Sequence, residues 1–124
     1  MPTHAYEHRN RLVALEEVGL HYNEWGDSGP DVLIIHGIMG TGVRWDLFAR
    51  SLLPDFHVIA PDLRGHGQSA RAGSYQIADY ARDMEQLIDH LELRHPIIVG
   101  HSLGGAIAMK LVGSGKISCS RLVI

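Results

Sequence analysis

Strand-length apolar runs alternate with helix-length segments along this 124-residue chain, and this alternation limits the folds open to it. Residues 32–35 are Val-Leu-Ile-Ile, a continuous run typical of a strand buried on both faces of a sheet, and residues 57–60 and 97–99 are further strands of this kind. Between the last two, apolar residues recur at three- and four-residue steps from Ile77 to Leu91, which predicts an amphipathic helix. The acidic residues of that helix are expected off its apolar stripe: Asp79, Asp83, Glu85 and Asp89. The whole pattern predicts an α/β fold, with a mostly parallel sheet and helices on both of its faces.

Shorter segments extend this alternation. A hairpin is predicted around Gly19, a short helix ends at Pro54, and a second apolar helix follows the last buried strand. These segments, with a final apolar run, are residues 12–17, 20–25, 45–53, 103–112 and 122–124. Because a strand of the buried kind without an outer neighbour leaves backbone groups unpaired, we expect residues 1–124 to form a single partial domain, truncated after about the sixth strand.

Composition narrows the classes of function. The net charge is −3 and the basic residues are scattered, so no nucleic-acid or anionic-membrane partner is expected. Nine histidines are present, but their spacing forms no zinc-type cluster, and we expect neither a metal nor another cofactor. No apolar run reaches the ~18 residues of a membrane span, and residues 1–11 hold no stretch of signal-peptide length. With Cys119 as its one cysteine, the chain is expected to be cytoplasmic.

Gly100-His101-Ser102-Leu103-Gly104 is a Gly-x-Ser-x-Gly sequence between a buried strand and an apolar helix. That context is typical of a nucleophile elbow, in which a sharp strand-to-helix turn exposes a reactive serine. The strained turn needs small neighbours, which Gly100 and Gly104 provide, and the N–H groups at the helix start favour developing negative charge. We predict that Ser102 is a catalytic nucleophile. The alternative is that Ser102 only caps the helix in a glycine-rich turn.

An oxyanion hole needs two backbone N–H groups that point at one place. The N–H of Leu103, directly after Ser102, is the first predicted donor, and the N–H of Ile38, in the glycine-rich loop after residues 32–35, is the second. Gly37 is expected to permit the turn, and His36 to hold this loop through hydrogen bonds rather than to act as a general base. The residues predicted to bind substrate are Gly37, Met39 and Trp45, with Ile38 and Leu103 as further pocket walls.

Three segments together resemble the α/β-hydrolase fold family: residues 32–40, residues 60–69 and residues 99–105, in that order. Within the family the chain is most similar to the serine-nucleophile esterases, lactonases and cofactor-free perhydrolases. The resemblance implies structural roles for Asp62 and His66. A serine at the elbow argues against haloalkane dehalogenases and epoxide hydrolases, which share the scaffold but use an aspartate there.

The resemblance also implies an activity. It implies a hydrolase that cleaves ester, lactone or similar acyl bonds of a small-molecule substrate, with Ser102 as nucleophile and Ile38 and Leu103 as oxyanion donors. The family places an acid and a histidine after the elbow, whereas residues 104–124 contain no Asp, Glu or His.

The histidine matters most, because its loss from a serine hydrolase costs on the order of 10⁶ in turnover. We therefore expect the isolated chain to be close to inactive. The missing acid and histidine are expected from a longer reading frame or from a second chain. The alternative function is a non-catalytic half-domain that associates with a second copy, or with a complementing half, through its exposed terminal strand.

Overall fold

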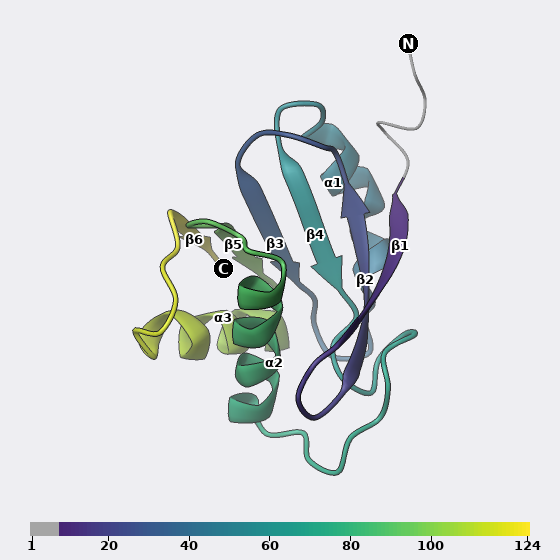
Figure 1. Ribbon diagram of the computed structural model, residues 1–124, viewed down its shortest axis with the longest axis vertical. Helices are drawn as coiled ribbons and strands as arrows, with labels where there is room; N and C mark the ends of the chain where they lie inside the picture. The colour runs from purple at the N-terminus through teal and green to yellow at the C-terminus, as the bar shows by residue number, and fades with distance from the viewer. Residues whose placement is uncertain (1–7) are drawn as a thin grey trace.

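Residues 8–124 are described by a computed structural model, in which the strands form one sheet (Figure 1). Within these residues, six strands lie in the order β1-β2-β4-β3-β5-β6. The pairs β1–β2 and β2–β4 are antiparallel, whereas β3–β4, β3–β5 and β5–β6 are parallel, so the prediction of a mostly parallel sheet is confirmed. The strands are β1 Arg9–Ala14, β2 Gly19–Trp25, β3 Asp31–Ile35, β4 His57–Pro61, β5 Ile97–Gly100 and β6 Arg121–Val123.

Helices cover both faces of the sheet, as the sequence predicts. The short 3₁₀ helix η2 (Gly42–Trp45) and α1 (Asp46–Ser51) lie against one face. The longer helices α2 (Ile77–His90) and α3 (Leu103–Gly113) pack together on the other face (Figure 1). Within residues 8–124, no helix is both long enough and apolar enough to cross a membrane.

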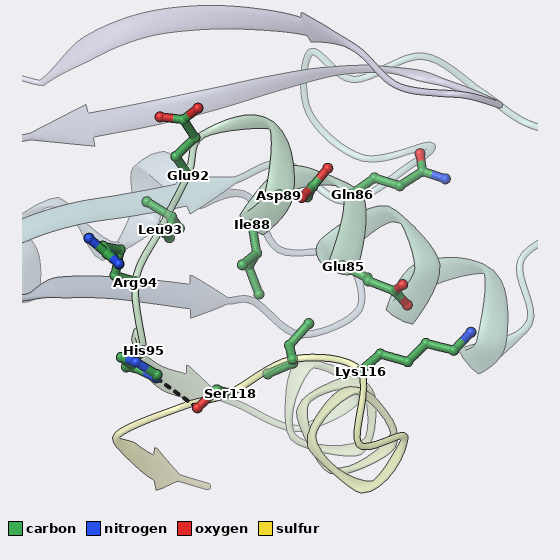
Figure 2. Close-up of a pocket in the computed structure, with 11 residues that line it drawn as sticks. Glu85, Gln86, Ile88, Asp89, Glu92, Leu93, Arg94, His95, Lys116 and Ser118 are labelled. Atoms are coloured by element: carbon green, nitrogen blue, oxygen red, sulfur yellow. Dashed lines mark hydrogen bonds between the residues drawn. The ribbon is translucent and has the colours of Figure 1, made fainter.

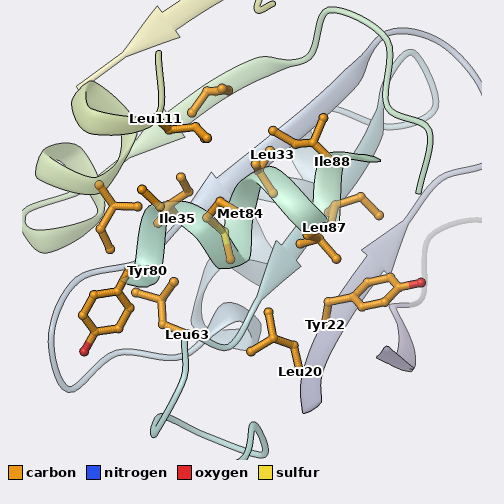
Figure 3. Close-up of a cluster of buried hydrophobic side chains, with 14 of the residues drawn as sticks. Leu20, Tyr22, Leu33, Ile35, Leu63, Tyr80, Met84, Leu87, Ile88 and Leu111 are labelled. Atoms are coloured by element: carbon orange, nitrogen blue, oxygen red, sulfur yellow. The ribbon is translucent and has the colours of Figure 1, made fainter. Parts of the chain in front are cut away.

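The central strands are continuously apolar because both of their faces are buried. Leu33 and Ile35 of β3 point into a cluster with the apolar stripe of α2 and with α3 (Figure 3). Their neighbours Val32 and Ile34 point the opposite way, into a second cluster with α1. Successive side chains of a strand alternate between faces, so an unbroken apolar run supplies both clusters at once.

The first hairpin differs from its prediction in register. β1 pairs with β2 from Arg9↔Glu24 to Ala14↔Gly19, so the strand starts three residues before the predicted 12–17. The turn consists of residues 15–18, closed by a hydrogen bond from the N–H of Leu15 to the carbonyl of Val18 (3.0 Å), and Gly19 begins β2 instead of forming the turn. The helix predicted over 45–53 is also shorter: Trp45 belongs to the 3₁₀ turn η2, and α1 ends at Ser51, two residues before the predicted end.

The expectation that Asp83 lies off the apolar stripe of α2 is wrong. Asp83 is 2% exposed and faces the core side of the helix, one turn after Tyr80 and one turn before Leu87. Its carboxylate accepts hydrogen bonds from Nε and Nη2 of the buried Arg64, both at 2.7 Å. A bidentate pair of this kind allows a charge to replace an apolar side chain in the stripe.

A histidine clamp, defined here as His57 with Glu24 and Asp31, joins the three strands β2, β3 and β4. The Nε2 of His57 lies 2.6 Å from Oε2 of Glu24, and its Nδ1 lies 2.7 Å from Oδ1 of Asp31. The hydrogen bond to Glu24 is the main cause that raises the pKa of His57 above its ordinary value of 6.5, with a smaller contribution from Asp31. The same hydrogen bond, followed by those from Arg11 and the charge of Arg9, lowers the pKa of Glu24 to about 2.

The clamp predicts a stability that depends on pH. The pKa of His57 is raised in the folded chain, so the stability that His57 contributes is complete below about pH 6.5 and is lost as the pH rises through the folded pKa. The pKa of Glu24 is lowered, so the stability that Glu24 contributes is lost only as the pH falls toward about 2. Relative to His57→Gln, the wild-type chain should lose about 1–2 kcal/mol of unfolding free energy between pH 5 and about pH 9, measured by urea denaturation. The control His90→Gln, at an exposed site, should track the wild type. Parallel profiles for the wild type and His57→Gln would contradict the clamp.

Candidate functional site

The predicted site residues gather at one edge of the sheet. β3, β4 and β5 run parallel, so the loops that follow them meet at their carboxyl ends, where ligands bind in open α/β sheets. The loop after β3 carries Gly37 and Ile38, and the turn after β5 carries Ser102. A β-carbon added to Gly37 would lie only 3.2 Å from Cβ of Ser102, so the fold brings together two segments that are 65 positions apart in sequence.

Ser102 has the backbone geometry of a strained strand-to-helix turn. Its φ of 56° and ψ of −117° form a combination that L-residues rarely adopt, and its side chain is exposed. It stands at the N-cap position of α3, yet within the described chain its hydroxyl makes no capping hydrogen bond. The carbonyl of Ser102 accepts hydrogen bonds from the N–H groups of Gly105 (2.9 Å) and Ala106 (3.2 Å), so the helix starts immediately.

Close packing explains both glycines that flank this turn. A β-carbon on Gly104 would lie 1.9 Å from the carbonyl oxygen of Ile35, at the end of β3. A β-carbon on Gly100 would lie 2.4 Å from the carbonyl oxygen of Gly104. Since both obstacles are backbone atoms, a larger residue at either position would push the start of α3 away from the sheet.

The two predicted oxyanion donors have free N–H groups. Leu103 is the first residue of α3, where the helix supplies no acceptor for an N–H. Within residues 8–124, neither Leu103 nor Ile38 donates a backbone hydrogen bond. The loop of Ile38 is closed by a hydrogen bond from the N–H of Gly40 to the carbonyl of Gly37 (3.0 Å).

The role expected of Gly37 needs correction. The positive φ in this loop belongs to Met39 (65°), and Gly37 has no such angle. A β-carbon on Gly37 would approach Cβ of Ser102 and Nδ1 of His101, the second at 3.3 Å. Gly37 therefore favours the close approach of its loop to the elbow, where a β-carbon would force its neighbours to shift, and the turn itself does not need it.

His36 is a structural residue, as predicted. It is 1% exposed and uses both ring nitrogens: Nδ1 donates to the carbonyl of Gly37 (2.7 Å), and Nε2 accepts from the N–H of Leu63 (3.0 Å). Burial lowers the pKa of His36, which keeps the ring neutral for these two roles. Neither nitrogen is left to accept a proton from Ser102.

Asp62 connects the loops at this edge of the sheet. Its carboxylate is 2% exposed and accepts hydrogen bonds from the N–H of Gly42 (2.8 Å) and the N–H of Gln68 (3.0 Å), and it pairs with Nδ1 of His21 (2.8 Å). The carboxylate of Asp62 thus forms hydrogen bonds with the loop after β3, with the loop after β4 and with strand β2. The structural role expected for Asp62 agrees with these contacts.

The residues predicted to bind substrate differ in exposure. Ile38 is 69% exposed and Met39 is 84% exposed, so both present apolar surface beside the elbow. Trp45 is half-buried, and the edge of its ring system packs against His101 at a centroid distance of 6.0 Å. No sequence pattern marked His101 for a role; its contacts with Gly37 and Trp45 arise only in the folded chain.

A concavity lies at the opposite edge of the sheet. It measures about 810 Å³ and is bordered by the C-terminal half of α2 and by the segments that enter β5 and β6 (Figure 2). His95 contacts Oγ of Ser118 there through Nδ1 (2.7 Å), and no hydrogen bond to a carboxylate orients that ring within residues 8–124. Nor do the described residues contain a cluster of three or more His, Cys, Asp or Glu that could hold a metal ion. The candidate site therefore remains the carboxyl edge around Ser102.

Strain at Ser102 leads to a testable prediction. The pair φ 56°, ψ −117° mirrors an ordinary extended conformation, so glycine adopts it without steric cost. Relief of the strain should outweigh the greater chain entropy of glycine, and Ser102→Gly should stabilise the chain by about 1 kcal/mol in urea denaturation. Ser114→Gly, at a helix cap with an ordinary φ of −67°, should instead destabilise it. A loss of stability in Ser102→Gly would show that the turn is unstrained.

Comparison with known proteins shows which family the chain resembles. Residues 30–124 match the model of the family described as alpha/beta hydrolase fold. The chain is 37% identical over 121 residues to the 3-hydroxybutyrate-oligomer hydrolase of Cupriavidus necator, covering 91% of this chain and 41% of that protein. It is also 37% identical over 108 residues to lipase LipV of Mycobacterium tuberculosis, covering 86% of this chain and 41% of that protein.

A solved structure of another hydrolase has the same fold over the matched part. The crystal structure of E-2-(acetamidomethylene)succinate hydrolase superposes with a TM-score of 0.88 at 32% identity, covering 94% of this chain and 43% of that one. The chain thus spans about two-fifths of the length of these proteins. Sequence, topology and the family match over residues 30–124 agree: the chain belongs to the α/β-hydrolase fold family.

Proposed function

We propose that this chain carries the nucleophile and the oxyanion hole of a serine hydrolase that acts on ester, lactone or similar acyl bonds. The observation that carries the proposal is the backbone of Ser102, whose φ of 56° holds an exposed hydroxyl at the start of a helix. The free N–H groups of Ile38 and Leu103 support it, because they come from the loop after β3 and from the residue after the nucleophile.

The chemistry follows from these groups. Oγ of Ser102 attacks the carbonyl carbon of the substrate while its proton passes to a base, and the carbonyl oxygen becomes an oxyanion that accepts hydrogen bonds from Ile38 and Leu103. Collapse of this intermediate expels the alcohol, which takes up the proton, and water then releases the acid and restores Ser102. Loss of one donor from an oxyanion hole costs about 10²–10³ in turnover.

The base and its orienting acid are the parts that residues 104–124 do not contain. We propose that a segment outside the 124 residues supplies both, since the matched hydrolases are more than twice as long as this chain. On this view the 124-residue chain alone retains the elbow and the donors with little turnover.

Active-site labelling tests the proposal. The longest reading frame that contains this chain should react with a fluorophosphonate probe, and peptide mass spectrometry should place the adduct on Ser102. Ser102→Ala should remain unlabelled, whereas Ser118→Ala, at the opposite edge of the sheet, should label like the wild type. An adduct on another residue, or none at all, would remove Ser102 as the nucleophile.

The second candidate function is association through β6. Leu122, Val123 and Ile124 are 38%, 50% and 64% exposed, and within the described residues β6 pairs on one side only, with β5. An edge strand with apolar side chains is suited to pair with another chain. Size-exclusion chromatography of the 124-residue chain separates the two: a dimer that does not react with the probe favours association, and a monomer argues against it.

A further inference from the structure

His101 stands between the two segments that form the proposed oxyanion hole. Ile97 and Val99 of β5 pack on the side of the sheet covered by α1, and His101 follows them at the same two-residue interval. The backbone continues the sheet here, because the N–H of His101 donates to the carbonyl of Ile35 (3.1 Å). The side chain is thus directed toward the segment that contains η2.

The imidazole of His101 is exposed, but it lies near two residues from other segments. Its Nδ1 lies 3.3 Å from the point that a β-carbon of Gly37 would occupy, so the ring is close to that glycine. The ring also lies edge-on to Trp45, with an interplanar angle of 63°. Trp45 is supported in turn by Phe48, whose ring stands at 80° to it with centroids 5.8 Å apart.

His101 lies beside the residue that precedes the proposed donor. Gly37 directly precedes Ile38, and the peptide between them carries the N–H assigned to the oxyanion hole. His36 donates a hydrogen bond to the carbonyl of Gly37, and His101 lies close to the same glycine. We infer that His101 is a positioning residue: close to both Gly37 and Trp45, its ring sets the position of the Ile38 N–H relative to Ser102.

The inference rests on the proposed function, and it assigns His101 a role of shape and not of proton transfer. Within residues 8–124, the imidazole forms no hydrogen bond, so what it contributes is the volume and planarity of a ring. Misplacement of a catalytic group by about 1 Å can cost about 10²-fold in rate. A smaller side chain at this position should therefore slow acylation while the substrate still binds.

Three variants of the longest reading frame test this role by the second-order rate of fluorophosphonate labelling. His101→Ala should label about 10- to 100-fold more slowly, whereas His101→Phe, which keeps a planar ring, should label close to the wild-type rate. With p-nitrophenyl butyrate, the loss in His101→Ala should fall on kcat and not on KM, and the pH profile of His101→Phe should match that of the wild type. The control is His90→Ala, an exposed histidine on α2 that should label normally.

Each outcome decides the inference. Wild-type labelling of His101→Ala overturns it. A His101→Phe variant that labels as slowly as His101→Ala also overturns it, because the planar ring is then not enough. If His101→Ala fails to fold, His101→Leu replaces it. Slower labelling of His101→Leu than of His101→Phe supports the inference, and equal labelling of the two variants overturns it. Labelling that persists in Ser102→Ala refutes the proposed function as a whole, which distinguishes that failure from a failure of His101 alone.

Discussion

Gly104→Ala should destabilise the chain by about 3–5 kcal/mol, although alanine favours helices by about 1 kcal/mol over glycine. The added methyl would lie 1.9 Å from the carbonyl oxygen of Ile35, 2.6 Å from its carbonyl carbon and 2.7 Å from the carbonyl oxygen of His36. All three atoms belong to the backbone at the end of β3, so no side-chain rotation relieves the clash. α3 must move away from the sheet, and the elbow moves with it.

Gly113→Ala is the matched control for this change. Gly113 is the last residue of the same helix, is exposed, and has no atom within 4 Å of an added β-carbon. Alanine there should stabilise the chain by about 0.5–1 kcal/mol. Urea denaturation of both variants should thus give opposite signs, and a Gly104→Ala variant as stable as the wild type would mean that α3 does not pack closely on β3.

Asp83→Ala should cost about 3–5 kcal/mol, because it leaves Arg64 as an unpaired charge in the core. The side chains of Arg64 and Asp83 are 1% and 3% exposed, and they share two hydrogen bonds of 2.7 Å. The other contacts of Arg64, with the carbonyl of Ser74 (2.9 Å) and with Glu17 (3.2 Å), do not replace a bidentate carboxylate.

Two comparisons isolate the buried charge in this prediction. Asp89→Ala, on the exposed side of the same helix, should change the unfolding free energy by less than about 0.5 kcal/mol. The double variant Arg64→Met, Asp83→Leu removes both charges and should lose less than Asp83→Ala alone. If the double variant were the less stable of the two, the unpaired charge of Arg64 would not be the cause of the loss in Asp83→Ala.

The sequence predicted well where a strong local signal is repeated or flanked by glycines. The apolar run before Gly37, the stripe from Ile77 to Leu91 and the glycines around Ser102 each depend on a few neighbouring residues, and all three were interpreted correctly. The bounds of short elements were less accurate, as in the first hairpin and the helix over 45–53, and the error at Asp83 occurred because a distant partner decides. Asp83 was expected in solvent because an isolated carboxylate belongs there, and only the arrival of Arg64 from the loop after β4 makes its buried position favourable.

The sequence by itself determined the alternation of strands and helices, that the central strands are buried on both faces, and that Ser102 stands on a strained turn. Only the tertiary structure decided that β3 lies between β4 and β5, and this strand order places Gly37 against Ser102 and His101. The physical reason is range: periodicity and turn chemistry act over a few residues. Strand order and buried ion pairs depend instead on contacts between segments that meet only when the whole sheet has formed.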